Sequence, residues 1–171
     1  IGRVISIGRE LQLYKVPFEM HIIGDGPQRQ DFESISFKSG LQRNIKFIGW
    51  QSKITVNQYY ESAHFILLPS TASEGWPKVL SEAMAHGVVP IASAISSIPE
   101  ILDRTQAGLA FPPTDIASFV EAIIQYASDE EIWKQTSLNG ISAAVDFTYE
   151  YYLNSLKKLF QETWNLKLNN E

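Results

Sequence analysis

The sequence predicts an α/β fold in which a parallel sheet carries helices on both faces. Short apolar segments alternate along the chain with longer segments of helical periodicity. Strands that alternate with helices in this way are typical of parallel sheets. Ligands bind such sheets beyond the carboxyl ends of the strands, and the glycine-containing loops of this chain fall there. No repeat, linker or low-complexity segment interrupts the pattern, so we expect a single domain over residues 1–171.

The periodicity predicts the individual elements in order. The expected helices span residues 1–14, 28–39, 55–62 and 77–86, and the expected strands span residues 18–23, 45–48, 64–68, 88–92 and 109–111. Asp115 and Asp129 are expected to cap two further helices, because a carboxylate at that position accepts a backbone hydrogen bond. A long C-terminal helix is expected from about Thr148, with aromatic and leucine side chains along one face.

Composition and charge exclude several classes of protein. Of the 171 residues 44% are apolar, which indicates a globular chain with a sizeable core. The net charge is −5 and the basic residues are scattered, so we expect no nucleic-acid partner. The absence of cysteine excludes disulfides and thiolate metal sites and fits a cytoplasmic location. No apolar run reaches the length of about 20 residues that a membrane-spanning helix needs.

Two carboxylates bracket the loop that leads into the helix expected at 77–86. Glu74 and Glu82 lie eight residues apart, and Pro77 suits the first helical turn because its missing N–H would have no partner there. The free N–H groups and the positive end of the helix dipole suit a phosphate. Glu82 would lie about two turns further along the helix, within reach of another part of a long ligand such as a nucleotide-sugar. Two glutamates at this spacing also occur on ordinary amphipathic helices, so the other motifs decide between these interpretations.

Those motifs resemble, in order, the C-terminal donor-binding half of retaining glycosyltransferases with the GT-B fold, in family GT4. The resemblance covers nearly the whole chain and includes the family's E-x7-E spacing at Glu74 and Glu82. It implies a Rossmann-like sheet and a nucleotide-sugar donor. The matching segments are residues 22–27, with the sequence Ile-Ile-Gly-Asp-Gly-Pro, and residues 45–49, 67–70, 74–87, 89–93, 98–100 and 108–111.

The resemblance assigns roles at the sugar and diphosphate end of the donor. Glu74 would meet the sugar and stabilise charge as the glycosidic bond breaks, which makes it the expected catalytic residue. Glu82 would accept hydrogen bonds from the ribose hydroxyls. The backbone N–H groups of the loop between them would hold the sugar and diphosphate, which assigns donor binding to Gly75, Trp76, Pro77, Lys78 and Val79.

The resemblance also assigns the base end of the donor. Gly24 and Gly26 would let their loop pass close to the ligand, where a Cβ would crowd it. The turn after the second strand would line the base pocket, through Gly49, Trp50 and Gln51. No metal and no other cofactor is expected, because the chain has no Asp-x-Asp pair and its three histidines are dispersed. The donor would be a nucleotide diphosphate sugar such as a UDP-sugar or a GDP-sugar.

The sequence departs from the family pattern in two places. The loop that usually carries two glycines reads Ser96-Ser97 here, which puts a close backbone approach in doubt. Family members also begin with a strand and a basic loop that clamps the diphosphate, whereas residues 1–15 align with the helix after that loop. We therefore expect the sheet to lack its first strand, with unpaired edges where segments 18–23 and 64–68 should flank it. A dimer or a segment swap is expected to fill that gap.

The expected function is that of a donor-binding domain, which supplies half of an active site. The full enzyme would transfer a sugar to an acceptor with retention at the anomeric carbon. The N-terminal acceptor domain is absent from these residues, so we expect no activity from the chain alone. Any peripheral attachment of the full enzyme to a membrane would lie in that other half. A nucleotide-sugar epimerase of GT-B fold and a non-catalytic nucleotide-binding module are the alternatives; Ser96-Ser97 favours the latter and the intact glutamate pair opposes it.

Overall fold

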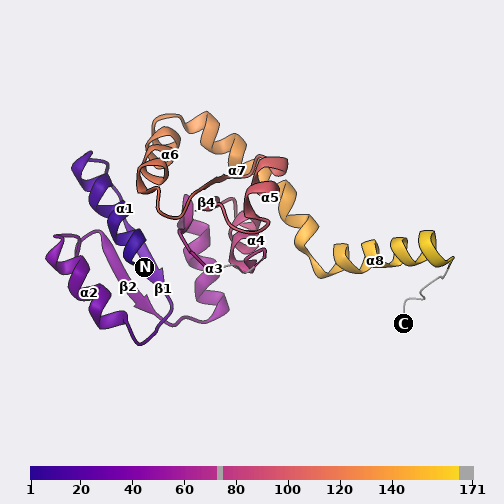
Figure 1. Ribbon diagram of the computed structural model, residues 1–171, viewed down its shortest axis with the longest axis horizontal. Helices are drawn as coiled ribbons and strands as arrows, with labels where there is room; N and C mark the ends of the chain where they lie inside the picture. The colour runs from indigo at the N-terminus through magenta and orange to yellow at the C-terminus, as the bar shows by residue number, and fades with distance from the viewer. Residues whose placement is uncertain (73–74, 166–171) are drawn as a thin grey trace.

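The fold is an alternation of helices and short parallel strands, described by a computed structural model for residues 1–72 and 75–165 (Figure 1). The strands are β1 (Met20–Ile23), β2 (Ile45–Gly49), β3 (Phe65–Leu68), β4 (Val89–Ser93) and β5 (Leu109–Phe111). The helices are α1 (Gly2–Leu13), α2 (Arg29–Lys38), α3 (Lys53–Ser62), α4 (Lys78–Ala85), α5 (Ile98–Thr105), α6 (Ile116–Ser128), α7 (Glu130–Ala144) and α8 (Tyr149–Trp164), with a 3-10 turn at Val145–Phe147.

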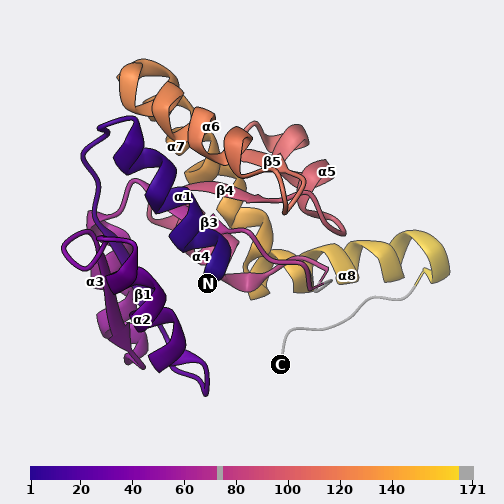
Figure 2. The same ribbon diagram turned by 60° about the vertical axis from the view of Figure 1, so that its left-hand side comes forward.

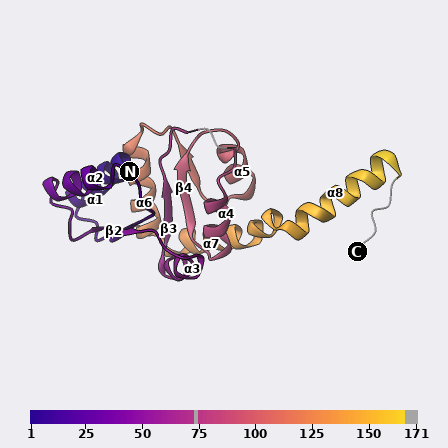
Figure 3. The same ribbon diagram turned by 90° about the horizontal axis from the view of Figure 1, so that it is seen from below.

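All strand pairs are parallel, as the alternating pattern predicted. β1 pairs with β2, and β4 lies between β3 and β5 in a second sheet. All five residues of β4 are buried, and successive residues face opposite sides. Figure 3 shows α6 on one side of β3 and β4 and α4 with α5 on the other. Helices therefore cover both faces of the sheet, and the predicted fold class is confirmed.

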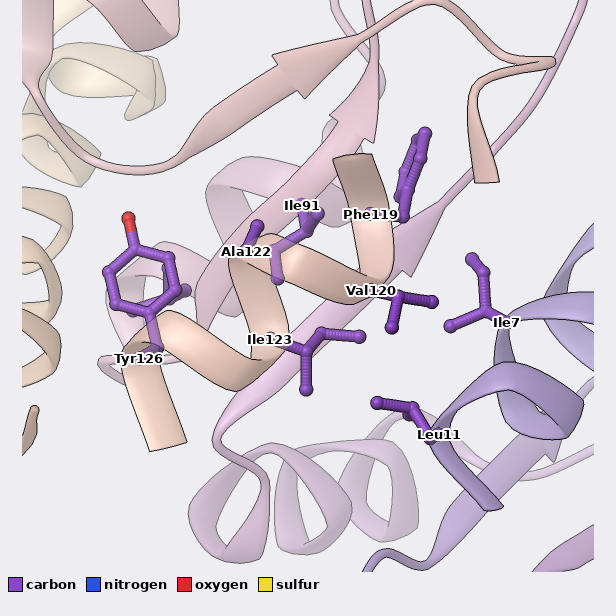
Figure 4. Close-up of a cluster of buried hydrophobic side chains, with 9 residues drawn as sticks. Ile7, Leu11, Ile91, Phe119, Val120, Ala122, Ile123 and Tyr126 are labelled. Atoms are coloured by element: carbon purple, nitrogen blue, oxygen red, sulfur yellow. The ribbon is translucent and has the colours of Figure 1, made fainter. Parts of the chain in front are cut away.

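Two apolar clusters hold the helices against β4. Val89 and Ile91 pack with α1 and α6, where Ile7 and Leu11 point toward Val120 and Ile123 (Figure 4). On the other face Ala92 packs against buried side chains of α4 and α5, among them Leu80, Met84, Ile98 and Leu102. The alternation along β4 thus divides the core into two layers, one for each helix pair.

Helix α1 ties the two sheets together. Ile5 packs with Leu41 and Ile45 in a third cluster, which lies against β1 and β2. On the other side of α1, Ile7 and Leu11 belong to the cluster that covers β4. Gly8 lies between these two contacts, and a Cβ there would come within 3.2 Å of the Ile45 side chain. The glycine that weakened the helical pattern in the sequence therefore allows a close approach of α1 to the small sheet.

The unpaired strand edges expected from the sequence are present. Within the described residues β1 bonds only to β2, and β3 bonds only to β4, so each strand has one open edge. Every residue of β3 is half-buried, in contrast to the full burial of the adjacent β4. Helix α3 leads from the small sheet into β3 and contributes no buried residue. The region between the two sheets is thus less completely covered than the rest of the core.

Most element boundaries agree with the sequence to within two residues, and side-chain caps explain several of them. Asp115 and Asp129 each accept a hydrogen bond from a backbone N–H in the first turn of the following helix, as predicted. Thr148, the expected start of the last helix, accepts one in the same way. Ser52 accepts from the N–H of Thr55, and α3 begins at Lys53, earlier than the pattern indicated. Pro77 was expected inside the first turn of its helix, but it is the N-cap of α4 with an extended backbone.

Of the helices α5 and α8, the sequence predicted only α8. Helix α5 was not predicted, since it is only eight residues long and has a proline in its first turn. Helix α8 was predicted, and Figure 2 shows it projecting from the body of the molecule. None of its residues is buried, and Tyr149, Tyr152 and Trp164 are each more than half exposed. No helix within residues 1–72 and 75–165 combines the length and apolarity needed to cross a bilayer.

We expect Gly108→Ala to lower the free energy of unfolding by about 1–3 kcal/mol, the usual range for overpacking a core. A Cβ on Gly108 would lie only 2.3 Å from the carbonyl oxygen of Pro90 in β4, so β4 and β5 would have to separate. Urea unfolding measures the change.

Gly140→Ala is the matched control for this substitution. Gly140 lies inside α7, and its added Cβ would make an ordinary contact 3.5 Å from Met84. The alanine should raise the free energy of unfolding by up to about 1 kcal/mol, because alanine is the better helix former. Equal stabilities for the two variants would contradict the close approach of β5 to β4.

Candidate functional site

The loop between β3 and α4 presents the N-terminus of a helix at the carboxyl end of the larger sheet. Gly75 has a φ of +67°, a left-handed conformation that a residue with a side chain adopts only with strain. Pro77 then caps α4, and the N–H of Leu80 bonds to its carbonyl oxygen at 3.0 Å. The first N–H groups of α4, which include those of Lys78 and Val79, have no acceptor within the helix. Glu74, the expected catalytic residue, lies outside the described residues.

Glu82 lies one turn into α4, on its partly exposed face. Its carboxylate is 3.5 Å from the Nζ atom of Lys78, whose side chain is 81% exposed. An ion pair this exposed contributes little to stability and exchanges readily for a ligand. The side chain of Lys78 thus points into solvent while remaining within reach of Glu82. The carboxylate is therefore accessible to hydroxyl groups, as ribose binding requires.

Tyr60 of α3 is a neighbour of Glu82 that sequence reasoning did not assign to the site. Burial, and after it the negative charge of Glu82, raise the pKa of the Tyr60 phenol above its usual value. The ring of Tyr60 lies 5.4 Å from that of His86, whose Nδ1 atom is 2.9 Å from the carbonyl oxygen of Glu82. Tyrosines of this kind are usual packing residues, so the sequence offered no signal for this contact.

One arginine, to which the sequence assigned no role, joins the loop after β1 to strand β2. Arg29 of α2 donates to the carbonyl oxygen of Phe47 at 2.9 Å, to Glu33 at 2.8 Å and to Asp25 at 3.3 Å. The hydrogen bond with Glu33, and further the charges of both carboxylates, raise the pKa of Arg29. The spacing of four residues from Arg29 to each acid was the signal available in the sequence.

Glycines shape the loops that follow β1 and β2. Gly24 has a φ of +122°, and its N–H bonds to the carbonyl oxygen of Gly49 at 2.8 Å. Gly49 has a φ of +80°, and a Cβ there would lie 2.7 Å from a guanidinium nitrogen of Arg29. A Cβ on Gly24 or Gly26 would meet nothing within 4 Å, so the space above the first loop is open. This open space fits the expectation that the loop lies next to a ligand.

The two tryptophans expected at the site have opposite environments. Trp50 is 76% exposed and follows β2 directly, so its indole is available to stack on a base. Its neighbour Gln51 donates a long hydrogen bond to the carbonyl oxygen of Ile48 at 3.4 Å. Trp76 instead stacks on Phe147, with ring centroids 4.9 Å apart and an angle of 16° between the planes. The Trp76 side chain is therefore a packing residue.

A small pocket opens beside the N-terminus of α4, above the carboxyl ends of β3 and β4. Its volume is about 60 Å³, and its walls come from the loop before α4 and from the loop between β4 and α5. Ser96 in the second loop has a φ of +53°, the left-handed conformation for which glycine is favoured. The residues that line the pocket are Leu68, Ser70, Ala72, Gly75, Pro77, Ser93, Ile95 and Ile98.

The structure thus gathers the predicted residues into two groups. Gly24, Gly26, Gly49, Trp50 and Gln51 lie at the carboxyl ends of the small sheet, and the α4 loop with Glu82 lies at the carboxyl end of the larger one. Among the residues that the structure describes, no cluster of His, Asp or Glu could hold a metal ion. What remains is an arrangement of open loops, free helix N–H groups and one accessible carboxylate, which suits an extended phosphorylated ligand.

Comparison with sequence families and curated proteins gives consistent matches. Residues 4–142 match the family described as glycosyl transferases group 1. An exopolysaccharide phosphotransferase of Streptomyces coelicolor is 30% identical over 146 residues, which are 85% of this chain and 15% of that protein. The lipopolysaccharide 1,6-galactosyltransferase of Salmonella typhimurium is 31% identical over 128 residues, which are 72% of this chain and 35% of that protein. The chain therefore spans about a third or less of these two relatives.

Solved structures confirm the fold. The sucrose-phosphate synthase of Thermosynechococcus elongatus superposes with a TM-score of 0.79 at 22% identity, over 95% of this chain and 42% of that one. The HepE protein of Anabaena, crystallised in complex with UDP, superposes with a TM-score of 0.74 at 21% identity, over 92% of this chain and 45% of that one. The resemblance to the C-terminal half of a GT-B glycosyltransferase, deduced from the motifs, is confirmed by these matches.

We expect Glu82→Gln to lower the pKa of Tyr60, since the substitution removes a negative charge that opposes ionisation of the phenol. Burial will keep that pKa above the usual value of about 10. An unfolded chain releases the proton first, so stability should fall as the pH rises above about 10, and less steeply in the variant. Titration of the tyrosine ring signals by NMR measures the pKa of Tyr60. Urea unfolding at several pH values measures the stability.

Tyr126 is the internal control for this titration. Burial raises its pKa and a hydrogen bond with Thr136 opposes the rise, so Glu82 has no part in it. An unchanged pKa for Tyr60 in the variant, or an equal change at Tyr126, would contradict the proximity of Glu82 to Tyr60.

Proposed function

Because this chain belongs to the family of glycosyl transferases group 1, we propose that it binds the donor of an enzyme that transfers a sugar from a nucleotide diphosphate sugar to an acceptor. The observation that carries the proposal is the loop before α4, which presents free helix N–H groups one turn from the accessible carboxylate of Glu82. The free N–H groups can bind a diphosphate, and the carboxylate can accept hydrogen bonds from ribose hydroxyls.

The donor would lie across both groups of site residues. Trp50 would stack on the base, Glu82 would accept hydrogen bonds from the ribose, and the N-terminus of α4 would hold the diphosphate. Glu74 would contact the sugar. UDP is the first nucleotide to test, because the HepE protein has been crystallised with UDP and with UDP and glucose.

Transfer would break the bond between the anomeric carbon and the diphosphate oxygen, which leaves with the electron pair. The acceptor hydroxyl would form the new bond and lose its proton, with net retention at the anomeric carbon. The N–H groups of α4 would stabilise the charge that develops on the leaving diphosphate, so we propose that no metal and no other cofactor takes part. The acceptor would bind in a part of the enzyme outside these residues, and we expect no transfer by this chain alone.

Nucleotide titration of the chain, followed by amide NMR, tests this function. With UDP, GDP or ADP we expect one nucleotide to shift the signals of residues 49–51 and 75–82, with or without a metal chelator. Glu82→Ala should weaken that binding about tenfold or more, because a hydrogen bond to a charged group contributes about 1.5–3 kcal/mol.

Glu130→Ala is the matched control. It breaks a Lys–Glu pair of the same spacing on α7, where Glu130 lies 2.9 Å from Lys134, and it should leave nucleotide binding unchanged. Failure of every nucleotide to bind would contradict the proposal. Release of UDP or GDP from a nucleotide-sugar only when an acceptor is present would separate a transferase from an epimerase.

We also propose that two copies of the chain associate through the open edges of β1 and β3. The N–H of Met20 bonds to Asn44 on the paired side of β1, so the N–H of the next residue, His21, faces the open edge. His21→Pro removes that donor and should shift the chain toward the monomer in sedimentation experiments. A wild-type chain that stays monomeric at all concentrations would contradict this association.

A further inference from the structure

The pocket beside α4 contains a buried hydroxyl group with no partner. Ser93, the last residue of β4, is only 1% exposed, and its Oγ atom makes no hydrogen bond. Buried polar atoms are nearly always hydrogen-bonded, and an unmet one costs about 1–3 kcal/mol. Ser93 is also one of the residues that line the pocket. Rotation about its χ1 angle, which has three staggered positions, can present the hydroxyl to that space.

The rest of the pocket wall is neutral and mostly apolar. Ser70 supplies the other hydroxyl, and its Oγ atom accepts a hydrogen bond from the N–H of Ala72 at 3.1 Å. None of the lining residues that the structure describes carries a charge. At α5 the N–H of Ile98 is already bonded to the carbonyl oxygen of Ile95, and Pro99 has no N–H. The pocket therefore offers little to a phosphate, and it suits a small group with one hydroxyl on a carbon atom.

The size of the pocket limits what can enter it. Pockets that hold whole ligands occupy about 300–1,000 Å³, whereas this one has about 60 Å³. A sugar ring is too large, but one substituent of a ring is not. The pocket borders Gly75 and Pro77, next to the N–H groups that would hold the diphosphate in the proposed function. A donor bound there would place its sugar, rather than its base, over this opening.

We propose that this pocket receives the exocyclic hydroxymethyl group of the donor hexose, and that Ser93 hydrogen-bonds its hydroxyl. The inference rests on the proposed function and deepens it, because it makes Ser93 a residue that selects hexoses over pentoses. A CH₂–OH group matches the wall: its carbon contacts the apolar side chains, and its hydroxyl both donates and accepts. Ser93 sits at the end of the most deeply buried strand, so its position is fixed by the core.

The test compares UDP, UDP-glucose and UDP-xylose, which lacks the hydroxymethyl group, by calorimetric titration of the chain. The wild type should bind UDP-glucose about tenfold or more tightly than UDP-xylose, the usual effect of a missing carbon group in a fitted pocket. Ser93→Ala should reduce that preference to about threefold or less and leave the affinity for UDP unchanged. If GDP is the nucleotide that binds, GDP-mannose and its 6-deoxy analogue GDP-rhamnose replace the pair.

Ser36→Ala is the matched control. Ser36 lies in α2, is 2% exposed, and likewise has an Oγ atom without a partner, but it lines no part of this pocket. Both alanine variants should be at least as stable as the wild type, because each removes a buried hydroxyl that bonds to nothing. Only the variant at Ser93 should alter the preference between sugars.

The outcomes separate this inference from the proposed function. If the nucleotide binds but Ser93→Ala keeps the preference for the hexose, or the wild type has none, the role of Ser93 is overturned and nucleotide binding stands. If no nucleotide binds, the proposed function fails and this inference fails with it. A preference lost equally in Ser36→Ala would also overturn the specific role of Ser93.

Discussion

The full burial of β4 is the constraint on which the rest of the structure depends. A parallel strand in the middle of a sheet must have both faces covered, because apolar residues project from each. Val89 and Ile91 draw α1 and α6 to one face, and Ala92 meets α4 and α5 on the other. The small sheet of β1 and β2 in turn packs against α1 through Ile5. One strand thus determines where four helices lie.

The same strand determines where the candidate site lies. Leu68 of β3 pairs with Ala92 of β4, so the chain leaves both strands at the same level and the two following loops emerge side by side. One loop leads through Gly75 into α4, and the other leads through Ser96 into α5. Both need a left-handed residue to turn, and the serine at the second position takes the strained conformation that the family's glycine would adopt freely. The pocket between these loops is a consequence of strand pairing.

The sequence predicted the features that depend on pattern. Periodicity predicted the strands and most helices, and local hydrogen bonding explains why the caps at Asp115 and Asp129 were correct. The order of the motifs predicted the family. The direction of side chains could not be predicted. Nothing in the sequence reveals that the ring of Trp76 stacks on Phe147, a residue far along the chain. Gly75 and Glu82 lie in the loop and on the helix where the motif spacing placed them, because that spacing reports backbone position; their roles stay predictions.

Contacts between distant elements were the other part that the sequence could not supply. Tyr60 meets His86 only because α3 and α4 lie together. Ser93 was one residue of a matching segment, and its importance appears only when its hydroxyl is seen to be buried without a partner. Arg29 is intermediate: its spacing to Asp25 and Glu33 was visible in the sequence, but its bond to Phe47 joins the start of α2 to strand β2, which is distant in sequence.

In the proposed reaction, this geometry divides affinity from selectivity between two parts of one site. The nucleotide end is exposed and charged, and a solvent-screened pair such as Lys78 with Glu82 distinguishes ligands weakly. The sugar end includes the small pocket at Ser93, whose described lining is mostly apolar, and a buried hydroxyl left without a partner there is costly. Discrimination between sugars therefore belongs at Ser93, on the rigid end of β4, and general affinity for nucleotide diphosphates belongs at α4. Substitutions in the β4–α5 loop can then change which donor sugar is preferred while the residues that bind the nucleotide stay the same.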